Sequence, residues 1–161
     1  MPNSVFYSEA PSTDPKFTHR FTYTTQLIVA RKFSSKFSME LLPTLTHRNF
    51  IVSQTNFSNG SIDQNDIFSM GGAARLKLTK RFAVLVDYFY NFSKSRQSNT
   101  SIAYYNPLGI GVEIETGGHV FHINLTNASG IVENDFIPNT TDSWWKGGFK
   151  LGFTISRVFG I

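Results

Sequence analysis

Histidine and carboxylate side chains are the groups of this chain most able to do chemistry, and their spacing limits what they can do. His119 and His122 form an H-x-x-H sequence. If this segment is a β-strand, residues three apart point to opposite faces, so the two imidazoles cannot bind one metal ion. The chain has no cysteine, which excludes disulfides and thiolate metal sites. We therefore predict no metal site and no cofactor.

Other short motifs give weak signals. "GIGVEI" begins like a dinucleotide-binding loop, but it lacks the third glycine and the following helix. "SIDQND" and "VENDF" group carboxylates that could bind calcium, although we prefer to interpret them as solvated loops. N-x-S/T triplets at Asn56, Asn59, Asn99 and Asn139 indicate polar loops rather than glycosylation. No motif names a reaction, so we predict no catalytic residues.

The elements that position these residues alternate between apolar and polar side chains, which is the period of a β-strand. The predicted antiparallel strands are longer than the roughly five to six residues usual in globular sheets. Strands of about nine to eleven residues cross a bilayer when tilted. The predicted strands are 17–33, 37–49, 67–78, 82–92, 104–116, 119–128 and 148–161, with residues 3–7 as a candidate eighth.

The connections between these strands alternate in length. Short turns at 34–36, 79–81 and 117–118 alternate with long loops at 51–66, 93–103 and 129–147. Short turns on one side of the membrane and long loops on the other are typical of outer-membrane barrels. We therefore predict an all-β protein, an antiparallel up-and-down transmembrane β-barrel, forming one domain over residues 1–161 and located in the bacterial outer membrane.

The composition agrees with this fold. Aromatic residues make up 15% of the chain and charged residues only 16%, below the roughly 25% of soluble domains. The longest wholly apolar run has five residues, Phe82–Val86, and the next, Leu27–Ala30, has four, so both are too short for a membrane helix. The net charge of +4 includes no basic run that would suggest nucleic acid. Aromatic side chains near the strand ends are predicted to lie at the membrane interfaces: Tyr23, Phe33, Phe82, Tyr88, Tyr90, Phe92, Trp144, Trp145 and Phe159.

The polar faces of the strands are rich in Gly, Ser, Thr and Asn, and we assign them to the barrel interior. Mixed charges in a narrow barrel form a closed, salt-bridged interior, whereas in a wide barrel they line a channel, and the sequence leaves both open. A soluble ligand-binding barrel with its apolar faces inward is the alternative fold. The predicted interior charged residues are Arg20, Glu40, Arg48, Arg75, Lys77, Asp87, Glu113, Glu115, His122 and Lys150.

One hairpin can be predicted with its register. Gly117-Gly118 suits a two-residue turn in which both residues have positive φ. Ile114 then lies opposite Phe121 on the lipid face, and Glu113 lies opposite His122 on the interior face. We expect a structural pair at this position, with the carboxylate favouring the imidazolium. At Pro43, which cannot donate to a β-ladder, we expect a bulge or a local edge.

Four stretches resemble a family of uncharacterised outer-membrane β-barrels of Gram-negative bacteria. They are "QLIVARKFSSKFSMELLPTLTHRNF", "NDIFSMGGAARLKLTKRFAVLVDYFY", "GVEIETGGHVFHINLTNASG" and "SWWKGGFKLGFTISRVF". The resemblance covers nearly the whole chain and implies the C-terminal part of a longer barrel that begins with a signal peptide. It also implies contact with outer-membrane lipid, lipopolysaccharide and the barrel-assembly machinery. The family offers no activity and no catalytic residues.

These patterns leave several functions open. We expect a porin-like, transport or structural barrel that is not an enzyme, with a surface-binding barrel or a lipid-modifying enzyme as alternatives. An odd count of seven strands does not match the even count usual for bacterial barrels. We therefore expect a fragment of a larger barrel with an open edge at its first strand, against the alternative of a complete eight-stranded barrel. The substrate and the oligomeric state are not determined by the sequence.

Overall fold

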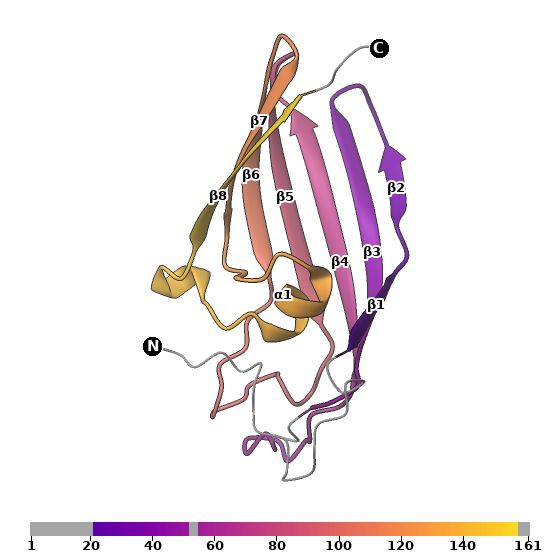
Figure 1. Cartoon of the computed structure of the whole chain (residues 1–161), viewed down its shortest axis with the longest axis vertical. Coiled ribbons are helices and arrows are strands. Elements are labelled where there is room, and N and C mark those ends of the chain that lie inside the picture. The colour runs from indigo at the N-terminus through magenta and orange to yellow at the C-terminus, as the bar shows by residue number, and fades with distance from the viewer. Residues whose placement is uncertain (1–20, 52–54, 158–161) are drawn as a thin grey trace.

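The computed structural model describes residues 21–51 and 55–157, which form one curled antiparallel sheet with a short helix against its concave face (Figure 1). The strand order is β1-β3-β4-β5-β6-β7-β8, and β2 also pairs with β3. Consecutive strands are therefore neighbours, as predicted for an up-and-down sheet. The strands are β1 (Thr22–Gln26), β2 (Val29–Lys32), β3 (Phe37–Arg48), β4 (Asp66–Lys77), β5 (Phe82–Asn91), β6 (Leu108–Thr116), β7 (His119–Thr126) and β8 (Lys150–Arg157).

The predicted first strand is divided into β1 and β2, and Pro43 explains the division. Both strands pair with β3 in one continuous register, so they form a single row with a break at residues 27–28. The Leu27 amide donates to the Pro43 carbonyl at 3.0 Å, but Pro43 has no N–H to return the bond. The expected local edge is therefore present, while the pairing of β3 with β4 continues through Pro43 without a bulge. Residues 17–20 of this predicted strand lie outside the described part.

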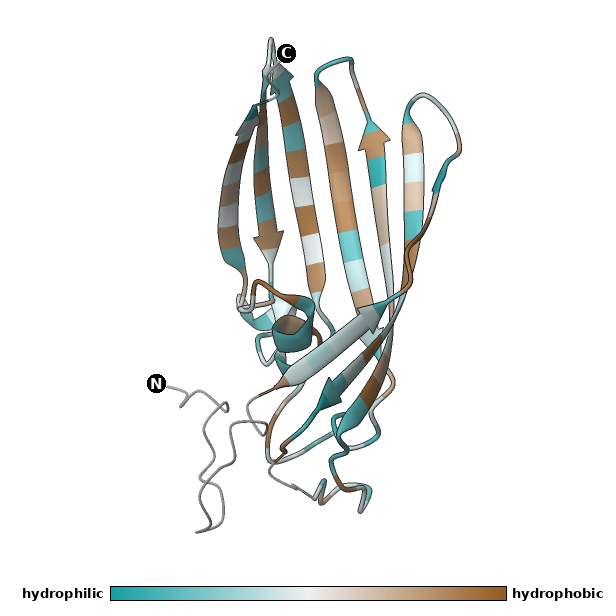
Figure 2. Cartoon of the chain, turned by 45° about the vertical axis from the view of Figure 1, so that its right-hand side comes forward, coloured by the Kyte–Doolittle hydropathy of each residue, from teal (hydrophilic) through white to brown (hydrophobic). Residues whose placement is uncertain are grey.

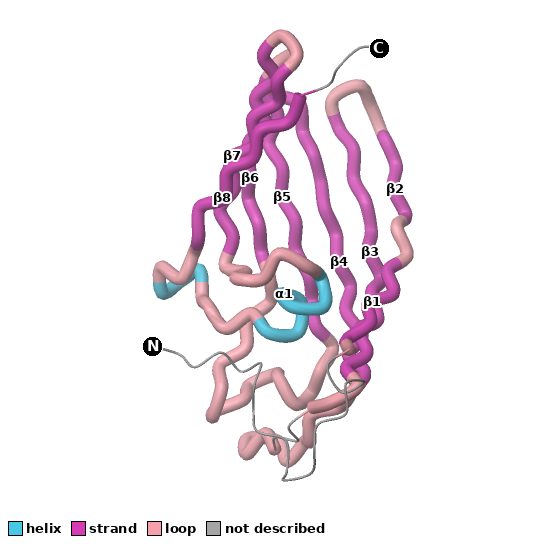
Figure 3. Tube along the Cα trace, in the orientation of Figure 1, coloured by secondary structure: helices cyan, strands magenta, loops and turns pink. Residues whose placement is uncertain are grey.

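The start of the predicted strand 104–116 is corrected by the structure. Residues 104–107 are not in the sheet, because this segment bonds to a later loop: the Tyr105 amide donates to the Thr140 carbonyl at 2.9 Å. The predicted loop 129–147 also differs, since it contains the helix α1 (Glu133–Asn139) and the 3-10 turn η3 (Trp144–Lys146) (Figure 3). Polar composition alone did not indicate that this loop would fold.

The predicted hairpin register is confirmed. Glu113 pairs with His122 and Ile114 pairs with Phe121. Gly117 and Gly118 have φ values of 48° and 114°, and the positive sign is what the tight turn requires. A side chain at Gly118 would be strained, because φ near 114° lies outside the region open to other residues.

The two faces of the sheet have the reverse polarity of a water-soluble sheet (Figure 2). Along β3, Leu41 and Leu45 are each 45% exposed on the outer face, while Thr44 and Thr46 are at most 1% exposed on the inner face. On β8, Phe153 is 60% exposed. Apolar side chains therefore face outward and hydroxyls are buried, which contradicts the alternative of a soluble barrel with an apolar interior.

The sheet is open among the described residues. No pairing joins β8 to β1 or β2, and a gap separates these edges in Figure 1. The predicted choice between an open fragment and a barrel closed by residues 3–7 cannot be decided from the described part, because residues 3–7 and 158–161 lie outside it. None of the helices in the described ranges is long and apolar enough to cross a membrane.

Candidate functional site

The segment 127–149, which we call the plug, folds onto the concave face near the long-loop end. Ile137 of α1 is 1% exposed and packs against Leu42 and Phe89. The Phe136 ring meets the Phe89 ring edge to face, with 5.5 Å between centroids. The carboxylates Glu133 and Asp135 lie in the first turn of α1, where the helix dipole favours negative charge. The plug is therefore packed into this end of the interior.

A glycine makes this packing possible. A Cβ at Gly71 would lie 2.3 Å from a ring atom of Phe89, so the ring crosses directly over the backbone of β4. Any larger residue would displace Phe89 from the plug. Gly109 leaves space in the same way, because a Cβ there would lie 2.3 Å from Asp87 Oδ1. Interior glycines thus give space to inward-facing side chains of the neighbouring strand.

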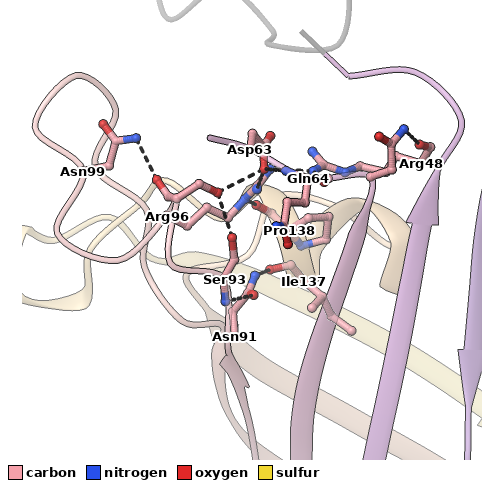
Figure 4. Close-up of polar contacts among 11 residues, drawn as sticks. Arg48, Asp63, Gln64, Asn91, Ser93, Arg96, Asn99, Ile137 and Pro138 are labelled. Carbon is pink, nitrogen blue, oxygen red and sulfur yellow. Dashed lines mark hydrogen bonds and ion pairs between the residues drawn. The ribbon is translucent and has the colours of Figure 1, made fainter. Parts of the chain in front are cut away.

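Polar contacts of the plug start from β5 and the loop that follows it (Figure 4). The Asn91 side-chain amide donates to the Ile137 carbonyl at 3.3 Å, and Arg96 Nε donates to the Pro138 carbonyl at 2.7 Å. Arg96 is 5% exposed, and its guanidinium lies 4.8 Å from the centroid of Tyr104. The end of β5 and the loop 92–107 therefore hold α1 through the carbonyl groups of its last turn.

Arg48, Asp63 and Arg96 form an ion-pair group that we call the loop cluster. Asp63 Oδ1 accepts from Arg48 Nη2 at 3.0 Å and also from Arg96 Nη1 (Figure 4). The three residues come from the end of β3, the loop 49–65 and the loop 92–107. Since Arg96 also bonds to Pro138, the cluster connects two long loops to the plug.

The electrostatics of the loop cluster favour the ionised form of Asp63. Burial acts to raise the pKa of Asp63, but Arg96 and Arg48 outweigh it and hold that pKa below its usual value. Burial raises the pKa of the Tyr104 hydroxyl beside Arg96. Asp63 therefore keeps its charge, and with it both ion pairs, at neutral pH.

A second charged group lies closer to the short turns. Arg75 Nε donates to Glu113 Oε2 at 3.2 Å, and Arg75 Nη2 donates to Glu113 Oε1. His122 Nε2 lies 3.4 Å from Glu113 Oε2 but makes no hydrogen bond of its own within the described structure. Ala83, 1% exposed, lies directly beside Glu113 on β5, and its small side chain leaves room for Arg75 to reach across.

The prediction that Glu113 and His122 share the interior face is confirmed, but the main partner of Glu113 was missed. Arg75 is two strands away, and only the combined registers of β4, β5 and β6 bring it close. The shared interior face of Arg75 and Glu113 was the available signal, since opposite charges facing one lumen tend to pair.

The other charged residues predicted to face the interior are spread along the whole length of the sheet. Glu40 and Asp87 line a cavity of about 430 Å³ on the concave side together with Arg75. Arg48 lies at the end of β3, with the same parity as the inward-facing Thr44 and Thr46, and belongs to the loop cluster. Lys150 bonds to Asp142 of the plug, and each is more than 40% exposed. Lys77 and Glu115 lie toward the short turns, and Arg20 is outside the described part.

The predicted interface aromatics lie mostly on the outer face. Tyr23 and Phe33 are more than half exposed, and Phe82 is half-buried. Trp144 instead donates from Nε1 to the Leu108 carbonyl at 3.0 Å and stacks on Phe149, whereas Trp145 is 97% exposed. Phe159 lies outside the described part. The remaining three, Tyr88, Tyr90 and Phe92, are 40–50% exposed on β5 and just after it.

Residues of the N-x-S/T triplets and of the acidic loop motifs make hydrogen bonds and ion pairs that hold the loops together. Asn56 is 0% exposed and donates to the Gln97 carbonyl at 2.8 Å, and Asn99 donates to the Ser95 carbonyl at 2.9 Å. The carboxylate of Asp63 is occupied by two arginines, so it is not free for calcium. In the described ranges, no three His, Asp or Glu side chains are grouped closely enough to hold a metal ion.

Comparison with known families agrees with the antiparallel sheet and its outward apolar face. The family model described as "Membrane bound beta barrel domain (DUF5777)" matches residues 3–159. The chain belongs to this family. Its domain is a membrane-bound β-barrel of unknown function, in agreement with the resemblance noted in the sequence. Neither a curated protein nor a solved structure matches the chain.

Proposed function

We propose that this member of the membrane-bound β-barrel family is a porin-like or transport barrel of the bacterial outer membrane, closed at its long-loop end by the plug. The observation that carries the proposal is the attachment of the plug. Its apolar contacts to the barrel wall are few, with Ile137 and Phe136 against Leu42 and Phe89. Its polar contacts reach only the long-loop ends of the strands, at Asn91 of β5 and Leu108 of β6, and the loops beyond them. Loops can move without breaking the sheet.

The interior beyond the plug supports passage of polar solutes. The inner face carries hydroxyls, glycines and charges of both signs, including Glu40 and Asp87, which have no ion-pair partner among the described residues. A purely structural barrel of this kind would be expected to pair its interior charges. The outer face, with its exposed aromatics, fits outer-membrane lipid and lipopolysaccharide as surroundings, and insertion by the barrel-assembly machinery.

Conductance in planar bilayers tests this function. A variant in which residues 131–139 are replaced by a short Gly-Ser linker should show steps of larger conductance, or open more often, than the unaltered protein. A matched control replaces the short-turn residues 34–36, which lie at the end of the sheet opposite to the plug. A barrel that inserts but does not conduct even without α1 would contradict the proposal and favour a structural or surface-binding role.

The lipid-modifying alternative has partial geometric support. His47 Nδ1 and Asp66 Oδ1 lie 2.7 Å apart on the outer face near the long loops, with both side chains exposed. A hydrolase would also need a nucleophile within hydrogen-bond reach of the imidazole. No Ser or Thr hydroxyl of the described residues is hydrogen-bonded to His47, so this pair lacks the nucleophile that a hydrolase mechanism requires. Our proposal is therefore transport rather than catalysis.

A further inference from the structure

The short turn between β2 and β3 is held in one shape by its own hydrogen bonds. The Ser34 hydroxyl accepts from the amides of Lys36 and Phe37 at 3.2 and 3.0 Å. The amides of Phe33 and Ser34 donate to the Phe37 carbonyl. Because a serine that bonds to its own backbone in this way fixes a turn, the exposed Lys36 has a defined position directly before Phe37.

The short turn between β4 and β5 repeats this pattern. The Thr79 hydroxyl accepts from the amides of Arg81 and Phe82, also at 3.2 and 3.0 Å. The amides of Leu78 and Thr79 donate to the Phe82 carbonyl. Lys36 and Arg81 therefore occupy equivalent positions in two turns at the same end of the sheet, each directly before a phenylalanine (Figure 1).

The cations at this end of the sheet are not neutralised by carboxylates. Arg31, Lys36, Lys80 and Arg81 are exposed and form no ion pair with another described residue. The amide of Glu115 donates to the Arg81 carbonyl, but the register places the Glu115 side chain on the interior face. We call these four cations the basic turn surface.

The long-loop end of the sheet has a different charge arrangement. Arg48, Arg96 and Lys150 are each paired with a carboxylate. Lys94 and Lys146 form no ion pair among the described residues, but the carboxylates in the first turn of α1 balance their charge. Positive charge that is available to a partner is therefore concentrated at the short turns.

The basic turn surface lies at the boundary of the apolar outer face. The Arg31 guanidinium lies 5.2 Å from the centroid of the Phe33 ring, which in turn lies 5.7 Å from the ring of Phe37. Next to Phe37 on β4, Leu76 is 44% exposed on the outer face. Aromatic rings of a barrel mark the membrane interface, so cations beside and just beyond them reach the level of the lipid headgroups.

We propose that the basic turn surface binds the phosphate groups of anionic phospholipids in the leaflet beside the short turns. Lys and Arg make strong, charge-assisted hydrogen bonds to phosphate oxygens. Lipid fits better than an acidic protein, because these cations adjoin an apolar face that itself lies in lipid. The inference rests on the membrane location in the proposed function, but not on conductance.

Spin-labelled lipids test this site in phosphatidylcholine bilayers that contain the full protein. Electron spin resonance gives the association of labelled phosphatidylglycerol with the barrel relative to labelled phosphatidylcholine. We expect a preference for phosphatidylglycerol, and Lys36→Gln with Arg81→Gln should lower it about fivefold for each cation removed. Lys36→Arg with Arg81→Lys should preserve it. The matched control, Lys94→Gln with Lys146→Gln, removes the same charge at the long-loop end and should have little effect.

Three results would overturn the inference. They are no preference in the unaltered protein, an equal loss in the two glutamine variants, and displacement of the lipid by inorganic phosphate but not by chloride at the same ionic strength. The first would leave the surface to another partner, such as an acidic protein, the second would mean an effect of net charge, and the third a site for soluble phosphate.

The outcome is separable from that of the conductance test. A barrel that prefers phosphatidylglycerol through these turns and does not conduct would contradict only the proposed function. A barrel that conducts and shows no such preference would contradict only the lipid site.

Discussion

At the scale of single residues, the interior is shaped by glycines as much as by charges. Gly71 lies beneath the ring of Phe89, whereas its neighbour Gly72 points outward, with its nearest heavy atom 3.7 Å from an added Cβ. Two adjacent glycines of β4 thus have different roles: one accommodates a ring that contacts the plug, and the other faces lipid.

This difference gives a direct test. Gly71→Ala should lower the free energy of unfolding by about 1–3 kcal/mol, because Phe89 is packed and cannot move aside freely. Gly72→Ala, the matched control, should change it little. In a Phe89→Ala background the cost of Gly71→Ala should nearly vanish. Urea unfolding of the refolded barrel in lipid measures all three, and an unchanged cost in that background would show that Phe89 is not the obstacle.

At the scale of elements, the long loops act together. The loop cluster joins the end of β3 to the loops 49–65 and 92–107, and Arg96 extends the connection to the C-terminal end of α1. Ion pairs with low exposure join these loops, together with hydrogen bonds such as that from Asn56 to the Gln97 carbonyl. The attachment of the plug to the long loops therefore depends on the charge of the Asp63 carboxylate.

The pH dependence of the loops follows from Asp63. Its pKa in the folded protein is below its usual value, so its stabilising contribution is complete above the unfolded pKa of about 3.9 and is lost as pH falls through the lower folded value. We expect proteinase K to cut the loop 92–107 only in strong acid, compared at fixed protease activity. If the loop is equally accessible at neutral and acidic pH, the cluster does not hold it.

Asp63→Asn should open the same loop at neutral pH. It leaves Arg48 and Arg96 buried without a counter-charge, which costs about 3–5 kcal/mol for a buried pair. Asp66→Asn is the matched control, because Asp66 is exposed and bonds only to His47 among the described residues. Equal cleavage of both variants would contradict the assignment.

At the scale of the whole molecule, the outward apolar face is the property that distinguishes a membrane barrel from a soluble sheet. Ile123 is 37% exposed and Asn124 follows it on the opposite face of β7. In water, an exposed isoleucine could be replaced by arginine at little cost. In a bilayer, arginine near the midplane costs about 2–4 kcal/mol.

The corresponding prediction compares these two neighbours. Ile123→Arg should lower the unfolding free energy in lipid vesicles by about 2–4 kcal/mol, whereas Asn124→Arg, which faces the interior, should be tolerated. Urea titration followed by tryptophan fluorescence measures both. If Ile123→Arg were neutral, the outer face would not be in lipid.

The sequence by itself determined the strands, their two faces and the register of the hairpin at Gly117-Gly118, because alternation and turn chemistry act between near neighbours. It also placed Glu113 opposite His122. Only the tertiary structure decided that residues 127–149 fold inward, that Arg75 reaches Glu113, and that Asp63 lies between Arg48 and Arg96. These contacts join residues from separate strands and loops, and their geometry depends on how the sheet curls, which local patterns do not encode.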